Sequence, residues 1–193
     1  MDDALERDLV TRLRGGDARA FDEIYERLRA RVFSFLARMT GRRDVADDLA
    51  QEVWLRLART APRLDPDTRL TAWIFTVARN LYISHWRAAQ VATALGGDLL
   101  PEPEAPAAGP FEAAAEAQTQ RQVERAVAAL PPAYREILLL CAVEGLAPRD
   151  AAAVLEITPE AARQRLARAR TMVAGALAGA DGAAASYRRG GAP

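Results

Sequence analysis

Residues 129–170, ALPPAYREILLLCAVEGLAPRDAAAVLEITPEAARQRLARAR, decide the fold of the C-terminal half of the chain. Pro148 and Pro159 each stand where a helical pattern begins, which is the position that proline favours at the start of a helix. Thr158 is placed as the N-cap of the second helix. The segment therefore predicts a short helix, a tight turn at residues 155–158 and a longer helix, which together form a helix-turn-helix.

The second helix of this motif has one apolar stripe and one polar face when it is drawn at about 100° per residue. The stripe consists of Ala162, Leu166, Ala169 and Val173. The opposite side presents Glu160, Gln164, Ala167 and Arg168, with Arg163 beside them. Arginine can donate two hydrogen bonds to guanine and glutamine can pair with adenine, so this face is predicted to enter a major groove. Arg165 and Arg170 lie toward its edges and are predicted to contact phosphates. The alternative is a solvated face on a structural helical hairpin.

The N-terminal half also reads as helices, separated by glycine, proline and aspartate. Gly16 stops a first helix, Asp17 caps a second that ends at Gly41, and Asp44 is predicted to cap a third. The expected helices cover residues 5–14, 18–40, 44–59 and 71–88, with a proline-bracketed loop at 62–70.

The third of these helices carries an acidic face. Its predicted core stripe is Ala46, Leu49, Ala50, Val53 and Leu57. The other face presents Asp47, Asp48, Gln51, Glu52 and Leu55. An acidic patch with an apolar residue inside it suits docking on a basic protein surface. The alternative is an ordinary solvated face with one exposed leucine.

The fourth helix, within residues 71–87 (TAWIFTVARNLYISHWR), has two stripes that contain large apolar side chains. One stripe is Ile74, Val77, Ala78 and Leu81, and the other is Phe75, Arg79, Tyr82 and Trp86. One stripe is expected to face the core. The second interleaves aromatic rings with arginine, which suits unstacked bases of single-stranded nucleic acid. The alternative is a helix buried on both sides.

Composition restricts the classes of function. The 193 residues have a formal net charge of zero, with 26 basic residues, all of them arginine, and 26 acidic ones. Cys141, the single cysteine, reads as core packing, and nothing near the single histidine, His85, supports a catalytic site. The sequence shows no phosphate-binding loop, metal cluster or nucleophile–base pair, so we expect no enzymatic activity and no cofactor. It contains no long apolar run or signal peptide, so we expect a cytoplasmic protein without membrane insertion.

The predicted fold is all-α, with two small helical domains joined by a flexible linker. Residues 90–118 are rich in alanine, proline, glycine and acid, and lack the large apolar side chains of a core. We therefore expect a first domain over 1–89, an acidic linker over 90–118, a helix-turn-helix domain over 119–179 and a disordered tail over 180–193.

Three motifs in this order resemble the extracytoplasmic-function (ECF) group of bacterial RNA polymerase sigma factors. They are DVADDLAQEVWLRL (44–57), AWIFTVARNLYISHWR (72–87) and the segment 129–170. The resemblance implies a promoter-specificity factor that binds core RNA polymerase, at its clamp and flap regions, and promoter DNA. It also implies an anti-sigma factor as a partner.

The resemblance assigns roles residue by residue. Asp48, Gln51 and Glu52 match the clamp-binding positions, within a predicted polymerase-binding set of Asp47, Asp48, Gln51, Glu52 and Leu55. Asn80 matches the residue that engages an extruded minus-ten base, and the loop 62–70 matches the loop that pockets that base. The predicted minus-ten set is Arg79, Asn80, Tyr82, Trp86 and Arg87. The predicted minus-thirty-five set is Arg163, Gln164, Arg165, Ala167, Arg168 and Arg170.

The chain departs from the family pattern in the helix-turn-helix. Ala147-Pro148 replaces the usual cap, Glu156 replaces the usual glycine of the turn, and residues 160–162 replace a glycine-threonine-valine stretch. Two rival functions are a self-contained helix-turn-helix repressor or activator and a helical adaptor without a DNA role. The aromatic–arginine stripe argues against both, because neither needs unstacked bases.

Overall fold

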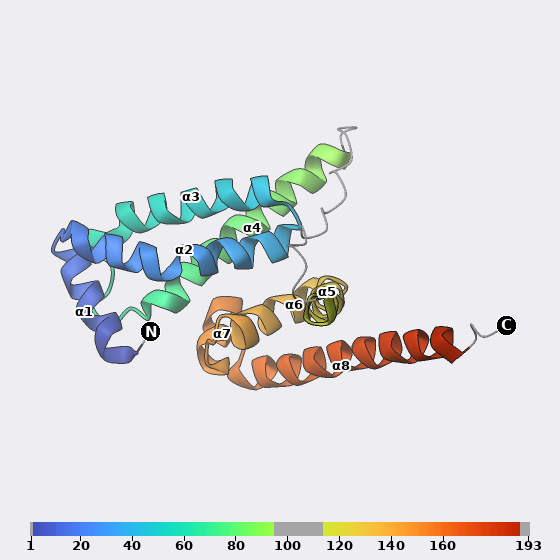
Figure 1. Ribbon diagram of the computed structural model, residues 1–193. Helices are drawn as coiled ribbons and strands as arrows, with labels where there is room; N and C mark the ends of the chain where they lie inside the picture. The colour runs from blue at the N-terminus through green and yellow to red at the C-terminus, as the bar shows by residue number, and fades with distance from the viewer. Residues whose placement is uncertain (1, 95–113, 190–193) are drawn as a thin grey trace.

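The computed structural model describes residues 2–94 and 114–189, and every regular element in those ranges is a helix (Figure 1). The N-terminal half contains α1 (Asp3–Arg14), α2 (Ala18–Thr40), α3 (Arg43–Thr60), the 3₁₀ turn η1 (Ala61–Arg63) and α4 (Leu70–Ala94). The C-terminal half contains α5 (Ala114–Ala128), α6 (Pro132–Leu138), the π-helical segment η2 (Leu139–Val143), α7 (Pro148–Leu155) and α8 (Pro159–Arg189). The predicted all-α fold class is confirmed.

The helix ends follow their sequence signals in most places. The Asp17 carboxylate accepts a hydrogen bond from the Arg19 amide at 2.9 Å and caps α2, and Gly41 ends α2 in the left-handed conformation. The predicted start of α3 was wrong. Arg42 is its N-cap residue and Asp44 lies inside the first turn, where its carboxylate pairs with the Arg42 guanidinium.

Helices α2, α3 and α4 pack around one core in the N-terminal half. Phe35 of α2 and Phe75 of α4 are fully buried, and their rings meet edge to face with centroids 5.4 Å apart. Phe75 is therefore a core residue, although its stripe was predicted to be spare. Within this stripe Trp86 is exposed, whereas Arg79 and Tyr82 are half-buried.

In the C-terminal half, α6, η2, α7 and α8 enclose a group of apolar side chains that belongs to the same continuous core as that of the N-terminal half. Its fully buried members include Ile137, Leu140, Val154 and Ala162. The chain leaves the π-helical segment through Glu144 and turns at Gly145, whose φ of 69° favours glycine.

The observed helices extend beyond the predicted domain boundaries. Helix α4 continues to Ala94 and α5 begins at Ala114, so both enter the predicted linker, whose residues 95–113 lie outside the described residues. Helix α8 continues to Arg189, whereas a disordered tail was predicted from residue 180. The tail is rich in alanine, the strongest helix former, and can extend an existing helix at little cost. Residues 190–193 are outside the described range.

None of the helices within residues 2–94 and 114–189 is both long and apolar enough to cross a membrane.

Candidate functional site

Helix α3 presents the predicted acidic face to solvent. Asp47, Asp48, Gln51 and Leu55 are exposed, and half of the Leu55 surface is accessible. Glu52 is half-buried and pairs with Arg56 at 3.0 Å, so its charge is partly satisfied within the helix. The predicted core stripe lies on the opposite side of α3: Ala46, Ala50, Val53 and Leu57 are buried, and Leu49 is half-buried.

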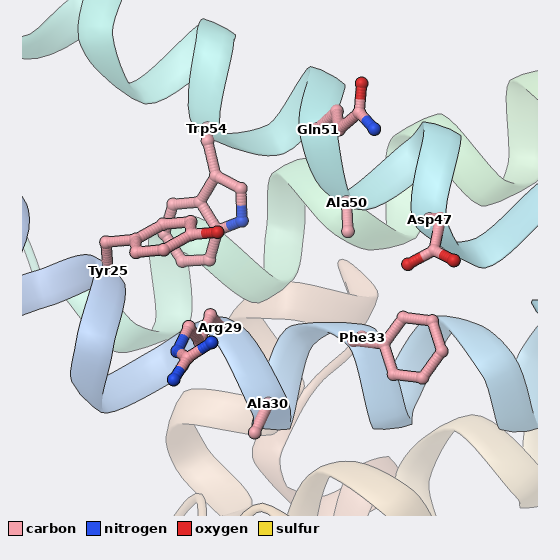
Figure 2. A pocket seen from close by; sticks show the side chains of 8 residues that line it. All are labelled: Tyr25, Arg29, Ala30, Phe33, Asp47, Ala50, Gln51 and Trp54. Atoms are coloured by element: carbon pink, nitrogen blue, oxygen red, sulfur yellow. The ribbon is translucent and has the colours of Figure 1, made fainter.

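A groove of about 340 Å³ separates the acidic face of α3 from α2 (Figure 2). Asp47 and Gln51 stand on its α3 side, and Arg29 and Phe33 stand on its α2 side. The groove therefore combines a carboxylate, an amide and a guanidinium with aromatic surface, which suits an amphipathic side chain from a partner.

At one end of the groove, Tyr25 and Trp54 pack edge to face, with ring centroids 5.1 Å apart (Figure 2). Tyr25 remains more than one-third exposed, whereas Trp54 is buried. Neither side chain was among the residues predicted to bind the polymerase. Tyr25 falls within the apolar pattern of its helix, so periodicity alone favoured a core position.

Helix α4 divides the predicted minus-ten residues into two groups. Asn80, Trp86 and Arg87 are exposed, and 45% of the Trp86 surface is accessible. Arg79 and Tyr82 are partly buried because the C-terminal half packs over them. Arg79 Nε donates a hydrogen bond at 3.2 Å to the Glu136 carboxylate of α6. Burial raises the pKa of the Tyr82 hydroxyl, and the charge of Glu136 adds to the rise while that of Arg135 opposes it.

The loop at residues 62–70 is anchored to α1. Leu64 and Leu70 are buried, and the Glu6 carboxylate, itself buried, accepts a hydrogen bond from the Thr71 amide at 2.7 Å. Arg69 lies 3.5 Å from that same carboxylate. These contacts fix the start of α4, so the loop that precedes Asn80 has a defined position relative to it.

The turn between α7 and α8 has helix-turn-helix geometry. Glu156 adopts the left-handed conformation with a φ of 55°, and its amide bonds back to the end of α7. Thr158 then caps α8 as predicted, since its hydroxyl accepts a hydrogen bond from the Ala161 amide at 3.1 Å. The replacement of the usual glycine by Glu156 therefore leaves the turn intact.

Helix α8 presents the predicted groove-reading face. Ala162, Leu166 and Ala169 are buried against the domain, and Val173 is half-buried. The exposed residues of the predicted set are Arg163, Gln164, Ala167, Arg168 and Arg170, while Arg165 is half-buried.

Glu160 restrains part of this face. It pairs with Arg163 at 2.6 Å and accepts a hydrogen bond from Gln164 at 3.2 Å. The hydrogen bond from Arg163 holds the pKa of Glu160 below its usual range, and that from Gln164 adds to the effect. Arg168 has no such acidic neighbour one turn before it, since position 164 is glutamine and 165 is arginine.

The fold and its surfaces define an all-helical protein of the helix-turn-helix class, with an acidic face on α3 apart from the exposed face of α8. Comparison with family models refines this class. Residues 24–91 match sigma-70 region 2, and residues 120–173 match sigma-70 region 4.

Similar proteins of known class cover most of the chain. RNA polymerase sigma factor CarQ from Myxococcus xanthus is 31% identical over 167 residues, which cover 82% of this chain and 90% of CarQ. ECF RNA polymerase sigma factor EcfG from Rhodopseudomonas palustris is 33% identical over 155 residues, which cover 78% of this chain and 80% of EcfG. The chain belongs to the ECF group of RNA polymerase sigma factors.

A solved structure has the same fold. CnrH, determined in complex with the cytosolic domain of CnrY, aligns with a TM-score of 0.68 and 23% identity over 91% of this chain and 98% of CnrH. Family membership makes the chain a promoter-specificity factor that binds core RNA polymerase and directs transcription initiation. It decides against the repressor and adaptor alternatives.

Proposed function

We propose that three surfaces of this chain divide the work of initiation. The acidic face of α3, with the groove beside it, docks on the clamp of core polymerase. The exposed end of α4, with Asn80, Trp86 and Arg87, takes up unstacked bases of the minus-ten element. The exposed face of α8 reads the minus-thirty-five element in the major groove, and a flap region of the polymerase holds the same half.

The observation that carries this proposal is the two-sided character of α8. Its buried side consists of small and aliphatic residues, and its exposed side groups Arg163, Gln164 and Arg168 on one surface. Guanidinium and amide groups supply the donors and acceptors that base edges require.

The chain itself breaks and makes no bond in this proposal. It supplies binding free energy that favours the open promoter, and the polymerase carries out nucleotide addition. We therefore place its action in the cytoplasm, where polymerase and chromosome meet.

An anti-sigma factor is a further proposed partner. CnrH and the sigma factor RpoE of Bartonella quintana were each determined with a bound partner, CnrY and the anti-sigma factor NepR respectively. Both share the fold of this chain, and its exposed surfaces on α3 and α4 are open to such a partner.

The docking role is tested by replacing Gln51 with alanine and Glu52 with arginine. Reversing the charge of this face should weaken binding to purified core polymerase by about tenfold or more, because close charges of like sign repel at a complementary interface. Asp8→Arg on α1 is the matched control, because Asp8 is exposed. Its partner Arg12 still pairs with Asp17 in this variant. Core affinity that stays at the control value, with an unchanged helical circular dichroism spectrum, would remove the docking role.

A further inference from the structure

Helix α1 carries an acid on its core side, at a position where an apolar residue would be expected. The buried residues of α1 are Glu6, Leu9, Val10 and Leu13, whose spacing of three and four places them on one side of the helix. Only 4% of the Glu6 surface is exposed. Burial of a carboxylate is costly unless hydrogen bonds and opposite charge compensate for it, so the partners of Glu6 show why the acid is tolerated there.

The partners of Glu6 belong to the start of α4. One carboxylate oxygen accepts a hydrogen bond from the Thr71 amide at 2.7 Å, and the other lies 3.5 Å from Nε of Arg69. The Arg69 carbonyl accepts a hydrogen bond from the Trp73 amide at 2.8 Å, so Arg69 holds the N-cap position of α4. An arginine side chain offers no acceptor to the free amides of the first turn, and Glu6 supplies one from another helix.

The contact with Glu6 also fixes one end of the loop at residues 62–70. Leu64 and Leu70 are buried near the two ends of this loop. Between them lies an exposed turn, in which the Asp65 carboxylate accepts a hydrogen bond from the Asp67 amide at 2.8 Å. Helix α1 packs beside both η1 and α4, so it borders the loop at its beginning and at its end (Figure 1).

The other wall of the proposed minus-ten pocket is held in a different way. Asn80 lies between Ala78 and Leu81, which are both buried in the core, so packing of α4 itself sets its position. The loop has no such helix of its own. A pocket for an extruded base needs both walls at a fixed separation, because hydrogen bonds tolerate only a narrow range of distances.

We propose that Glu6 is a positioning residue for minus-ten recognition: from α1 it caps α4 and holds the loop at residues 62–70 at the separation from Asn80 that base capture requires. Glu6 is buried, so it acts through the loop and not by contact with DNA. Helix α1 precedes the match to sigma-70 region 2, which begins at residue 24. The inference rests on the proposed role of the loop and α4 in base capture.

Three substitutions in α1 test this inference. Glu6→Met keeps a similar volume and removes the acceptor, whereas Glu6→Gln keeps an acceptor oxygen and removes the charge. Leu13→Ala is the matched control, because Leu13 is buried at the other end of α1 and its truncation lowers stability by leaving a cavity. Arg69 is less suitable for replacement, because it also pairs with Asp3 and Asp150.

Amide hydrogen exchange of the free protein, followed by NMR, measures the cap directly. The Thr71 amide should exchange about tenfold faster in Glu6→Met, relative to amides in the middle of α3, because its bond to a charged acceptor is lost. Glu6→Gln and Leu13→Ala should leave this relative rate close to that of the natural protein. A relative rate that Glu6→Met does not change would overturn the inference.

Holoenzyme reconstituted with core polymerase measures the effect on promoter opening. Glu6→Met should lower the permanganate reactivity of promoter thymines roughly tenfold, in line with the loss of one charged hydrogen bond. Affinity for core polymerase and for the upstream duplex should stay close to that of the natural protein, and Glu6→Gln should retain most of the reactivity. Equal defects in Glu6→Met and Leu13→Ala, at a similar loss of thermal stability, would make Glu6 structural only and overturn the inference.

The double variant Glu6→Met, Asn80→Ala separates this inference from the proposed function. If both residues serve one pocket, the double variant should open the promoter about as well as the worse of the two single variants. Defects that multiply would place Glu6 outside the pocket, so the inference would fail while the role of α4 stands. A silent Asn80→Ala would instead remove the proposed base-capture role of α4, and with it the pocket on which the inference rests.

Discussion

At the residue scale, Glu156 stands out because it is the one non-glycine residue with a positive φ within the described ranges. A side chain in the left-handed conformation costs about 1–2 kcal/mol. The chain tolerates the strain because the Glu156 and Ile157 amides both bond back to the last turn of α7. These bonds and the Thr158 cap together hold the helix-turn-helix in this geometry.

Replacing Glu156 with glycine should therefore stabilise the C-terminal half. We expect a gain of about 0.5–1 kcal/mol, which is less than the full strain because glycine has more freedom in the unfolded chain. The melting temperature should rise by roughly 1–4 °C. Glu156→Ala is the control, since it removes the same charge and keeps the Cβ atom. Equal melting temperatures for the two variants would show that backbone strain is not the cause.

Glu144 predicts a dependence of stability on pH. Burial raises the pKa of its carboxyl, and hydrogen bonding to Arg31 and the charges of Arg31 and Arg38 offset only part of the rise. An acid with a raised pKa binds its proton more tightly in the folded state, so it contributes stability at low pH that is lost as pH rises through that pKa.

Glu144→Gln cannot titrate, so its stability relative to the natural protein should improve as pH rises above the ordinary glutamate range. Urea unfolding of both proteins, followed by circular dichroism at acidic and neutral pH, measures the difference. The buried, partly compensated state of Glu144 would be contradicted if the difference in unfolding free energy between the two proteins did not change with pH. It would also be contradicted if Glu144→Gln became relatively more stable toward acidic pH.

At the scale of elements, helices were predictable wherever one face is apolar and the other is not. The buried stripes of α3 and α8 follow directly from spacing, and so do the exposed faces with Gln51 and Arg168. The orientation of helix α4 is harder to predict, because both of its sides carry large apolar residues. Periodicity alone cannot show that Phe75 is buried in the core while Trp86 is exposed. No feature of the sequence predicted the π-helical segment η2.

Helix α8 also predicts how promoter affinity responds to salt. Arg170 lies at the edge of the groove-reading face and is exposed, as a phosphate contact requires. Arg170→Ala should reduce the slope of log affinity against log salt by about 1, with little change in sequence preference. Holoenzyme binding to a promoter duplex over a salt series measures the slope. Arg125→Ala on α5 is the control, and a slope that matches this control would assign Arg170 no phosphate contact.

At the scale of the whole molecule, the sequence predicted two halves and their order but not how they meet. The ion pairs between them join residues 57, 81 and 113 positions apart, and nothing in local spacing links such partners. Their consequence is that Arg79, predicted to meet DNA, meets Glu136 instead in the free protein. Most candidate residues on α3 and α8 are already exposed and need no such rearrangement, whereas Glu52 and Arg165 are half-buried.

The central claim is that α4 and α8 carry separate parts of promoter recognition, and permanganate reactivity of promoter thymines with polymerase present tests it most directly. The comparison uses Asn80→Ala and Arg168→Ala on duplex and on pre-melted templates. Arg168→Ala should weaken recognition of the upstream duplex roughly tenfold or more, since a bidentate base contact contributes about 1–3 kcal/mol. Asn80→Ala should spare that recognition and impair melting, and pre-melting the template should relieve much of its defect. An Asn80→Ala defect that pre-melting leaves unchanged would make Asn80 structural and would contradict the division of roles.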